Sequence, residues 1–249
     1  VYGPESTGKT TLGLSAVREA QRLEAESGEA LPCLYCDAEH AMDTFYAESM
    51  GIDLANLTIS QPGCGEDALN EVESGINAGY RVIIVDSVSA LTPRAEIEGE
   101  MGEAHVGLQA RLMSQALRKL TGTVAKTGAI ILFINQIRTK VGVVFGNPEV
   151  TSGGQALKFY ATYRIEIRAP RKGKKTGKTL MGYGDTTQTQ DVELGTDVVA
   201  KVNKNKVFPP HRSANFTIVY GQGIDKVADA ISFLEFAGAF KSRKGKDVV

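Results

Sequence analysis

Short apolar runs alternate with amphipathic stretches through the first half of the chain. The apolar runs occupy residues 31–37, 57–60, 81–86 and 129–135. Around them, apolar positions recur with a helical period, which predicts helices over residues 11–26, 41–50, 66–78 and 106–125. Strands that are apolar on both faces are typical of parallel sheets covered by helices on both sides. We therefore expect an α/β fold with a mostly parallel central sheet and helices on both faces.

The second half of the chain follows a different pattern. Residues 163–168 alternate as a strand does, and residues 197–203 and 215–219 predict strands that extend the sheet in antiparallel fashion. Residues 170–190 are rich in Gly, Lys and Thr and predict an exposed excursion. A last helix is predicted over residues 227–236. We divide the chain into a core domain, residues 1–221, and the beginning of a small C-terminal domain, residues 222–249.

Composition and charge narrow the class of protein. The chain has 249 residues, 42% of them hydrophobic and 23% charged, which is enough to bury one large core. The net charge of −1 provides no overall attraction to DNA or to a membrane, so an anion site must come from a local cluster. With three cysteines and no expected signal peptide, we predict a cytoplasmic protein. Cys33 and Cys36 lie in one apolar run and face opposite sides of a strand, so we interpret them as core residues.

The strongest chemical signal lies in residues 3–10, which read Gly-Pro-Glu-Ser-Thr-Gly-Lys-Thr and match the phosphate-binding pattern G-x-x-x-x-G-K-[ST]. Gly3 and Gly8 allow the tight turn that aims backbone N–H groups at phosphate oxygens. Lys9 supplies a charge for the β- and γ-phosphates, and Thr10 supplies a hydroxyl for Mg²⁺. A chance glycine turn is the alternative, but the helical pattern that follows directly favours a phosphate loop.

Polar residues end the apolar runs. Glu39, Asp86, Asn135 and Gln136 stand at these ends, and ligands of parallel sheets bind at the carboxyl ends of the strands. We predict that Asp86 holds Mg²⁺ through water, that Glu39 activates the attacking water as a general base, and that Gln136 senses the γ-phosphate. The alternatives are a carboxylate that caps the next turn, a solvated turn glutamate and an ordinary strand-end glutamine.

A second signal lies in residues 136–152, which show little helix or strand pattern. A loop of this length in a compact domain is usually functional or disordered. It carries cationic and apolar side chains together, namely Arg138, Lys140, Val141, Val143, Val144 and Phe145. Charges that follow a phosphate backbone, with apolar groups inserted between bases, suit sequence-independent binding of single-stranded DNA.

The expected partner of this loop is the segment of residues 98–107. Val106 stands near its tip, and Arg111 and Arg118 follow on the predicted helix. We place these residues in the same DNA-binding surface. For the two arginines, a solvated helix face is the alternative.

Several stretches together resemble the bacterial and phage RecA recombinase family. They are residues 3–12, 37–43, 85–93, 95–100, 133–138, 145–149 and 153–160, which read GPESTGKTTL, DAEHAMD, VDSVSALTP, AEIEGE, FINQIR, FGNPE and GGQALKFY. The resemblance covers nearly the whole chain in the right order. It is far more specific than the phosphate loop, which many unrelated nucleotide-binding proteins share.

The resemblance implies a role for each matching residue. Glu39, Lys9, Gln136, Lys204 and Lys206 correspond to catalytic residues, with the two lysines reaching across a subunit interface to the neighbour's ATP. Phe159 corresponds to an interface residue that couples neighbouring sites. The implied nucleotide-binding residues are Gly3, Pro4, Glu5, Ser6, Thr7, Gly8, Lys9, Thr10, Thr11, Asp43, Tyr46, Tyr220 and Gly221, and the implied metal-binding residues are Thr10 and Asp86. The implied DNA-binding residues are Val106, Arg111, Arg118, Arg138, Lys140, Val141, Gly142, Val144, Phe145, Gly153 and Gly154.

The function implied by the resemblance is that of an ATP-dependent DNA recombinase. Such a protein uses ATP and Mg²⁺, forms a helical filament of its own copies on single-stranded DNA, and pairs that strand with homologous double-stranded DNA. It serves recombinational repair and the SOS response to DNA damage, and it needs no membrane. A ring-forming helicase or motor ATPase on the same core is the alternative. A regulatory relative without hydrolysis is disfavoured, because Lys9, Glu39 and Asp86 are all present.

The chain also departs from the family pattern. Val106, Thr139 and Val144 stand where the family usually has methionine, so apolar bulk is mostly retained. The excursion at residues 170–190 is longer than in typical bacterial members and carries Arg171, Lys172, Lys174, Lys175 and Lys178. These cations form either a secondary patch for duplex DNA or a solvated hairpin. The family's N-terminal helix and strand, which join subunits, do not occur in this sequence, and we expect them in a longer protein.

Overall fold

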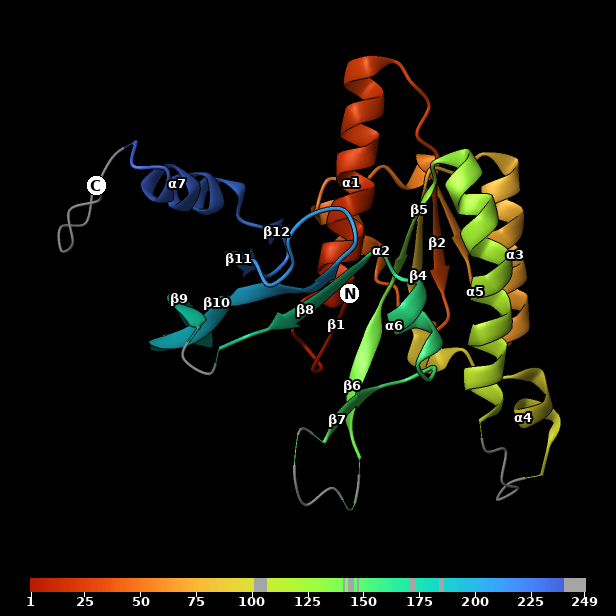
Figure 1. Cartoon of the computed structure of the whole chain (residues 1–249). Coiled ribbons are helices and arrows are strands. Elements are labelled where there is room, and N and C mark those ends of the chain that lie inside the picture. The colour runs from red at the N-terminus through yellow and green to blue at the C-terminus, as the bar shows by residue number, and fades with distance from the viewer. Residues whose placement is uncertain are drawn as a thin grey trace.

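The protein is an α/β structure in which helices pack on both faces of a parallel sheet, as predicted (Figure 1). The structure, a computed structural model, describes residues 1–100, 107–140, 142, 146, 148–170, 173–183 and 186–239, with the backbone alone at residues 177–183 and 186–191. Within this part of the chain, hydrogen bonds organise the strands into a four-stranded and an eight-stranded sheet.

The four-stranded sheet is entirely parallel and has the order β3-β2-β4-β5. Its strands are β2 (Cys33–Asp37), β3 (Leu57–Ser60), β4 (Val82–Asp86) and β5 (Ile130–Phe133). The helices α3 (Gly65–Ala78) and α5 (Leu108–Thr127) cover one face, and α1 (Lys9–Ser27) and α2 (Thr44–Ser49) cover the other. The apolar runs that predicted these strands are therefore buried on both sides.

Alternate residues of β2 and β4 enter opposite cores. Leu34 and Ile83 pack under α3 and α5, whereas Tyr35 and Ile84 pack under α1 and α2. Cys33 and Cys36 follow the same alternation, and both are buried free thiols. Their interpretation as core residues is confirmed.

The eight-stranded sheet joins the start of the chain to its second half. Its strands are β1 (Tyr2–Gly3), β6 (Asn135–Thr139), β7 (Glu149–Thr151), β8 (Tyr163–Arg168), β9 (Lys174–Tyr183), β10 (Thr186–Asn205), β11 (Ser213–Val219) and β12 (Gly223–Ile224). β1 lies between β6 and β8 and is parallel to both. The strands from β8 onward pair in antiparallel fashion, as the pattern predicted.

Three predicted elements differ from the structure. The strand predicted over residues 129–135 is divided into β5 and β6, because Ile134 donates its N–H to Val85 while Asn135 donates to Val1 on the other side. The helix predicted over residues 41–50 begins only at Thr44, because the Asp37 carboxylate holds the N–H groups of Ala41 and Met42 in a turn. The segment of residues 136–152, predicted without regular structure, contains the antiparallel pair β6 and β7.

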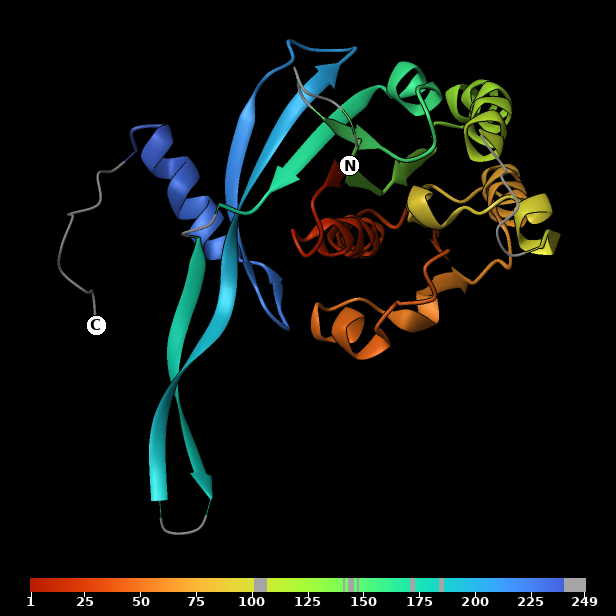
Figure 2. The same ribbon diagram turned by 90° about the horizontal axis from the view of Figure 1, so that it is seen from below.

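The excursion predicted over residues 170–190 is a hairpin formed by β9 and the first half of β10. It projects away from the rest of the molecule, as Figure 2 shows from below. Lys174 pairs with Glu193 and Lys175 with Asp197, so part of its positive charge is compensated. Arg171, Lys172 and the side chain of Lys178 lie outside the described residues.

The remaining elements are short or peripheral. They are the helices α4 (Arg94–Glu98), α6 (Ala156–Tyr160) and α7 (Lys226–Phe236), and the 3₁₀ turns η1 (Leu54–Asn56) and η2 (Val88–Ala90). The last predicted helix is thus confirmed as α7, which lies beyond β11 and β12 at the edge of the molecule (Figure 1). Among the described helices, none has the length and apolar character that a membrane crossing requires.

Candidate functional site

The phosphate loop connects β1 to α1, and its two glycines have a structural reason. Gly8 has φ +85°, and a Cβ atom there would lie 2.1 Å from Cδ1 of Ile218. A Cβ atom on Gly3 would lie 2.2 Å from the carbonyl oxygen of Ile167. At Gly8 the positive φ disfavours any other residue, and at Gly3 a Cβ atom would collide with the backbone of β8. The residues between them are therefore held in a tight turn at the N-terminus of α1, which attracts anions.

Lys9 lies in the first turn of α1 and folds back over the loop. It is only 8% exposed, and its Nζ donates to the Pro4 carbonyl at 2.5 Å. Thr7 Oγ1 donates to the same carbonyl at 2.8 Å. Burial lowers the pKa of Lys9, while Asp86, Glu39 and Glu5 act in the opposite direction. A phosphate would be a stronger, charged partner for the Lys9 ammonium than the neutral Pro4 carbonyl, so this contact can be exchanged when an anion binds.

Thr10 and Asp86 form the pair that suits Mg²⁺. Thr10 Oγ1 donates to Asp86 Oδ2 at 2.7 Å, and the Tyr35 hydroxyl donates to the same oxygen at 2.8 Å. Burial raises the pKa of Asp86, and these two hydrogen bonds oppose the rise. In nucleotide sites Mg²⁺ takes one or two carboxylates together with substrate phosphates, so a hydroxyl and one carboxylate fit this ion.

Glu39 and Gln136 meet across the strand ends, as predicted. Gln136 Nε2 donates to Glu39 Oε1 at 2.9 Å. The same oxygen accepts a hydrogen bond from the buried hydroxyl of Ser87, the residue after Asp86. Asn135, also predicted at this edge, turns away from the loop, and its amide donates to the Ser152 carbonyl at 2.9 Å. Glu39 Oε1 thus accepts two hydrogen bonds from residues at two different strand ends.

These residues surround a cavity of about 810 Å³, within the range of small-molecule sites. The predicted residues that line it are Glu5, Ser6, Thr7, Gly8, Lys9, Thr10, Thr11, Glu39, Tyr46, Asp86, Gln136, Tyr220 and Gly221. Gly3 and Pro4 shape the loop without lining the cavity. Asp43, predicted to bind nucleotide, does not line the cavity, and its carboxylate caps α2 by accepting from the Tyr46 N–H at 3.0 Å. Tyr46 then reaches Thr11, with 2.9 Å between their hydroxyl oxygens.

The sequence did not reveal several contributors to this cavity. Tyr35 and Ser87 are buried polar partners of the carboxylates, and Thr196 and Ile218 line the cavity from β10 and β11. Tyr35 lies in an apolar run and has the pattern of a core residue. Thr196 and Ile218 are distant in sequence and come to the loop only through the antiparallel strands.

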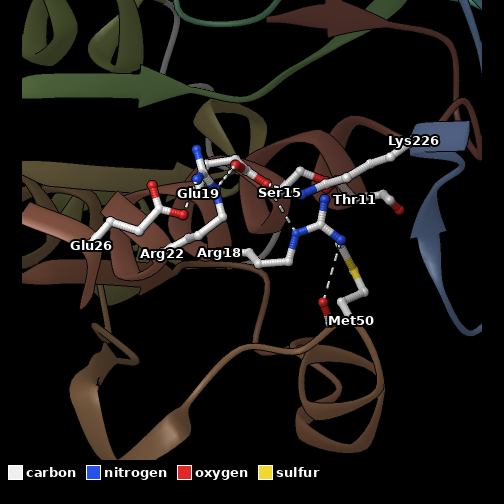
Figure 3. Close-up of polar contacts among 8 residues, drawn as sticks. All are labelled: Thr11, Ser15, Arg18, Glu19, Arg22, Glu26, Met50 and Lys226. Atoms are coloured by element: carbon white, nitrogen blue, oxygen red, sulfur yellow. Dashed lines mark hydrogen bonds and ion pairs between the residues drawn. The ribbon is translucent and has the colours of Figure 1, made fainter. Parts of the chain in front are cut away.

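The segment that follows Gly221 is linked to α1 through Lys226, the first residue of α7, which contacts Glu19. Lys226 Nζ donates to Glu19 Oε1 at 2.5 Å, and Arg22 contacts the other oxygen of this carboxylate at 2.8 Å (Figure 3). The Lys226 and Arg22 contacts lower the pKa of Glu19 to about 2. Because Tyr220 and Gly221 line the cavity five or six residues earlier, this cluster anchors the wall that they form.

Lys204 and Lys206 lie on a different surface. Lys204 Nζ donates to the carbonyls of Lys158 and Phe159 at 2.7 and 2.8 Å, and Lys206 Nζ donates to Tyr160 at 3.1 Å. These carbonyls end α6, where the helix dipole favours cations. Burial lowers the pKa of Lys204, and the neighbouring Lys206 and Arg164 act in the same direction. We call the set of Lys204, Lys206 and Phe159 the lysine face; none of its members lines the cavity of its own chain.

The predicted DNA-binding residues fall into separate groups. Arg138 Nε donates to Ser152 Oγ at 3.2 Å and lines a second cavity, of about 380 Å³, beside β7. Gly153 and Gly154 have φ +78° and +73° and pack against α5, so the chain leaves the hairpin close to that helix. Lys140 donates its backbone N–H to Pro148 at 2.9 Å, and Gly142 has φ +85°.

Arg111 and Arg118 are not brought together with Arg138. Arg111 lines a groove between α3 and α5 that also contains Glu66 and Glu73, and Arg118 Nε donates to the Ser114 carbonyl on its own helix. The other residues predicted at this surface lie outside the described part of the chain; they are Val106, Val141, Val144 and Phe145.

Comparisons with known proteins identify the family of the chain. The sequence profile of the RecA N-terminal domain matches residues 1–225. "Protein RecA" of Allochromatium vinosum is 48% identical over 255 residues, which cover 100% of this chain and 68% of that protein. Proteins of the same name from Lactobacillus acidophilus and Clostridioides difficile are each 50% identical, over 98% and 93% of this chain and 64% and 61% of their own length. The chain thus spans less than two thirds of these two relatives. On this evidence, the chain belongs to the RecA family.

Proposed function

We propose that this protein is an ATP-dependent DNA recombinase of the RecA family. It binds ATP with Mg²⁺, assembles into a helical filament on single-stranded DNA, and promotes pairing and strand exchange with homologous double-stranded DNA. Its relatives' name, Protein RecA, supports this reading. We place the protein in the cytoplasm, with a role in recombinational repair and the response to DNA damage. We keep residues 1–221 as the ATPase core and residues 222–249 as the start of a second domain.

The single observation that carries the proposal is the contact between Gln136 and Glu39. Gln136 Nε2 donates to Glu39 Oε1 at 2.9 Å beside the phosphate loop. Gln136 is also the second residue of β6, the strand that continues to Arg138 and the predicted DNA-binding hairpin. Two residue steps of extended backbone therefore connect the proposed γ-phosphate sensor, Gln136, to the proposed DNA-contacting cation, Arg138.

The chain's own groups perform the remaining roles. The backbone N–H groups of the loop and the Lys9 ammonium bind the phosphates, and Thr10 and Asp86 hold Mg²⁺, which neutralises phosphate charge when bound. Glu39 accepts the proton of the attacking water as a general base. Tyr46 and Tyr220 provide aromatic surface at the cavity for the base.

Assembly follows from the placement of the lysine face. A helical filament repeats one head-to-tail contact that does not close. In that contact, Lys204 and Lys206 leave the α6 carbonyls and reach the phosphates held by the next copy. The exposure of Phe159, 72% in one copy, supports an interface at the same place. ATP then lies between two copies, so its hydrolysis weakens the filament and releases DNA.

Electron microscopy distinguishes this proposal from the ring-forming helicase. The whole protein is imaged with single-stranded DNA and a non-hydrolysable ATP analogue. We expect open helical filaments along the DNA, and none when ADP replaces the analogue. Closed hexameric rings under both conditions would favour the helicase and contradict the recombinase.

A further inference from the structure

Two hydroxyl groups connect Glu39 with the cavity beside Arg138. The Ser87 hydroxyl donates to Glu39 Oε1, and its oxygen lies 3.2 Å from the Ser89 hydroxyl oxygen. Ser87 is 1% exposed, whereas Ser89 lines the 380 Å³ cavity together with Arg138 and Ser152. One end of this pair touches the proposed general base, and the other end opens on the proposed DNA-binding side.

The chemistry of the groups sets the direction of the hydrogen bonds. An ionised carboxylate only accepts, and a serine hydroxyl has one proton to donate. The Ser87 hydroxyl donates to Glu39 Oε1 and, over a longer distance of 3.2 Å, to the Ser89 oxygen, so Glu39 and Ser89 share one proton. Hydrogen bonds in such a chain polarise one another, so a Ser89 hydroxyl that donates its own proton becomes a better acceptor of the Ser87 proton.

The turn that carries both serines is also linked to the exit of the hairpin. Gln109 on α5 donates from Nε2 to the carbonyls of Val88 and Leu91, at 2.9 and 3.2 Å. Its Oε1 accepts from the Gly153 N–H at 3.1 Å. One side chain therefore holds η2 and the segment after β7 together, so the two serines keep a fixed place relative to Arg138.

We propose that Ser87 is a positioning residue for Glu39, and that Ser89 makes this positioning sensitive to a phosphate of single-stranded DNA in the cavity beside Arg138. The inference rests on the proposed function. A phosphate oxygen that accepts the Ser89 proton makes the Ser89 oxygen a stronger acceptor of the Ser87 proton, in competition with Glu39. The bond from Ser87 to Glu39 then weakens, and the carboxylate becomes freer to accept the proton of the attacking water. This hydroxyl path acts in addition to the route through Gln136.

The test compares ATP turnover with and without single-stranded DNA. Ser89→Ala removes the hydroxyl, Ser89→Cys keeps its volume but weakens the hydrogen bond, and Ser89→Thr keeps the hydroxyl. Ser74→Ala on the exposed face of α3 is the matched control. We measure kcat and KM for ATP with saturating oligothymidine and without it, together with oligothymidine affinity and thermal melting.

We expect Ser89→Ala and Ser89→Cys to lower the ratio of DNA-stimulated to basal kcat by about three- to tenfold, the size of one lost hydrogen bond. KM for ATP and the affinity for oligothymidine should stay within about twofold of the wild type. Ser89→Thr and Ser74→Ala should keep the wild-type ratio. A normal ratio in both Ser89→Ala and Ser89→Cys, or a loss fully explained by weaker DNA affinity, would overturn the inference. A wild-type protein without any DNA stimulation would instead refute the proposed function.

Discussion

The phosphate loop and the lysine face both present cations, but only the cation of the phosphate loop lies in a cavity with carboxylates of its own chain. Lys9 is buried in a cavity with Asp86 and Glu39, and a hydroxyl and a carboxylate for a metal ion lie beside it. Lys204 and Lys206 contact backbone carbonyls at the end of α6, on a surface outside that cavity. The cation of the phosphate loop thus lies beside carboxylates of the same chain, whereas those of the lysine face contact backbone carbonyls, as we propose for groups that serve a neighbouring copy.

Substitutions at the phosphate loop and at the lysine face should differ in their energetic cost, because the charges of the loop are buried and those of the lysine face are partly exposed. Buried charges at the phosphate loop are costly unless they are paired, so removing one of them has a large effect. The lysine face is partly exposed, and its hydrogen bonds to carbonyls contribute little on their own. In the proposed filament, its contribution would arise on assembly, when the lysines are desolvated against phosphate. Changes at the two places should therefore differ in size and in their dependence on protein concentration.

The largest effect is expected from Lys9→Ala. Without the buried ammonium, the affinity for ATP should fall by about 10²-fold or more, at any protein concentration, because a charge-assisted contact inside one chain is lost. ATP-dependent DNA binding should be lost as well. Isothermal titration with ATP and Mg²⁺ measures the affinity, and Lys126→Ala on the exposed end of α5 is the control. An unchanged ATP affinity would remove the phosphate-binding role of the loop.

Glu39→Gln tests catalysis at the same place without loss of binding. The amide keeps an oxygen that accepts from Ser87 and Gln136 but does not act as a base. Turnover should therefore fall by about 10²-fold or more, with the affinity for ATP retained. Single-turnover hydrolysis measures the chemical step, and Glu48→Gln on α2 is the control. Normal turnover would show that another group activates the water.

The double substitution Lys204→Ala with Lys206→Ala tests the lysine face directly. Turnover should fall by about 10-fold or more on single-stranded DNA, because the site of the next copy lacks its cations. An equal mixture with Glu39→Gln protein should regain activity, since sites with Glu39 from one variant and lysines from the other are complete. Lys201→Ala on the same strand is the control. If the mixture stays as inactive as each variant alone, the lysines act within their own chain.

Arg138→Ala should have a smaller effect, confined to DNA binding. Loss of one phosphate contact should weaken the affinity for oligothymidine and reduce the slope of log affinity against log salt concentration by about 1. Fluorescence anisotropy at several salt concentrations measures both, with Arg22→Ala as the control. The same salt slope in the variant would place the contact elsewhere.

The smallest effect is expected at the anchor between α1 and α7. Glu19→Gln should lower the free energy of unfolding by about 0.5 kcal/mol at neutral pH, because the ion pairs are partly exposed. The pKa of Glu19 is lowered from 4.5 to about 2 in the folded protein, so this contribution is present above pH 4.5 and is lost as the pH falls toward 2. Urea unfolding of wild type and variant at pH 7 and pH 3 measures it, with Glu48→Gln as the control. A difference that grew at pH 3 would contradict the assignment.

Much of the cavity around the phosphate loop was predictable, because the sequence patterns that indicate it span only a few residues each. The loop needs glycine, lysine and threonine at set intervals, and Asp86, Glu39 and Gln136 end apolar runs whose parallel arrangement brings their carboxyl ends together. The role of Tyr35 was not predictable, because its hydroxyl is brought to Asp86 only by the pairing of β2 with β4. Ser87 looks like an ordinary turn residue until its neighbour across the strand ends is known.

Other differences have equally specific causes. The apolar run at residues 129–135 looks like one strand, but Ile134 and Asn135 hydrogen-bond to neighbours on opposite sides and divide it. The sequence did not show that the Asp43 carboxylate caps α2, because this contact depends on where that helix begins. Arg111 and Arg118 share a helical spacing with no information about which neighbour each one meets.

By itself, the amino-acid sequence determined the α/β class, the phosphate loop, the residues at the strand ends and the hairpin of the excursion, because spacing and periodicity act over a few residues. Only the tertiary structure decided that one oxygen of Glu39 accepts hydrogen bonds from both Ser87 and Gln136. It also decided that Thr196 and Ile218 line the cavity, whereas Lys204 and Lys206 contact the end of α6 outside it. These relations join positions 45 to 210 residues apart, from Lys204 with Phe159 to Ile218 with Gly8. They depend on strand order and register, which the backbone hydrogen bonds of the whole sheet set together.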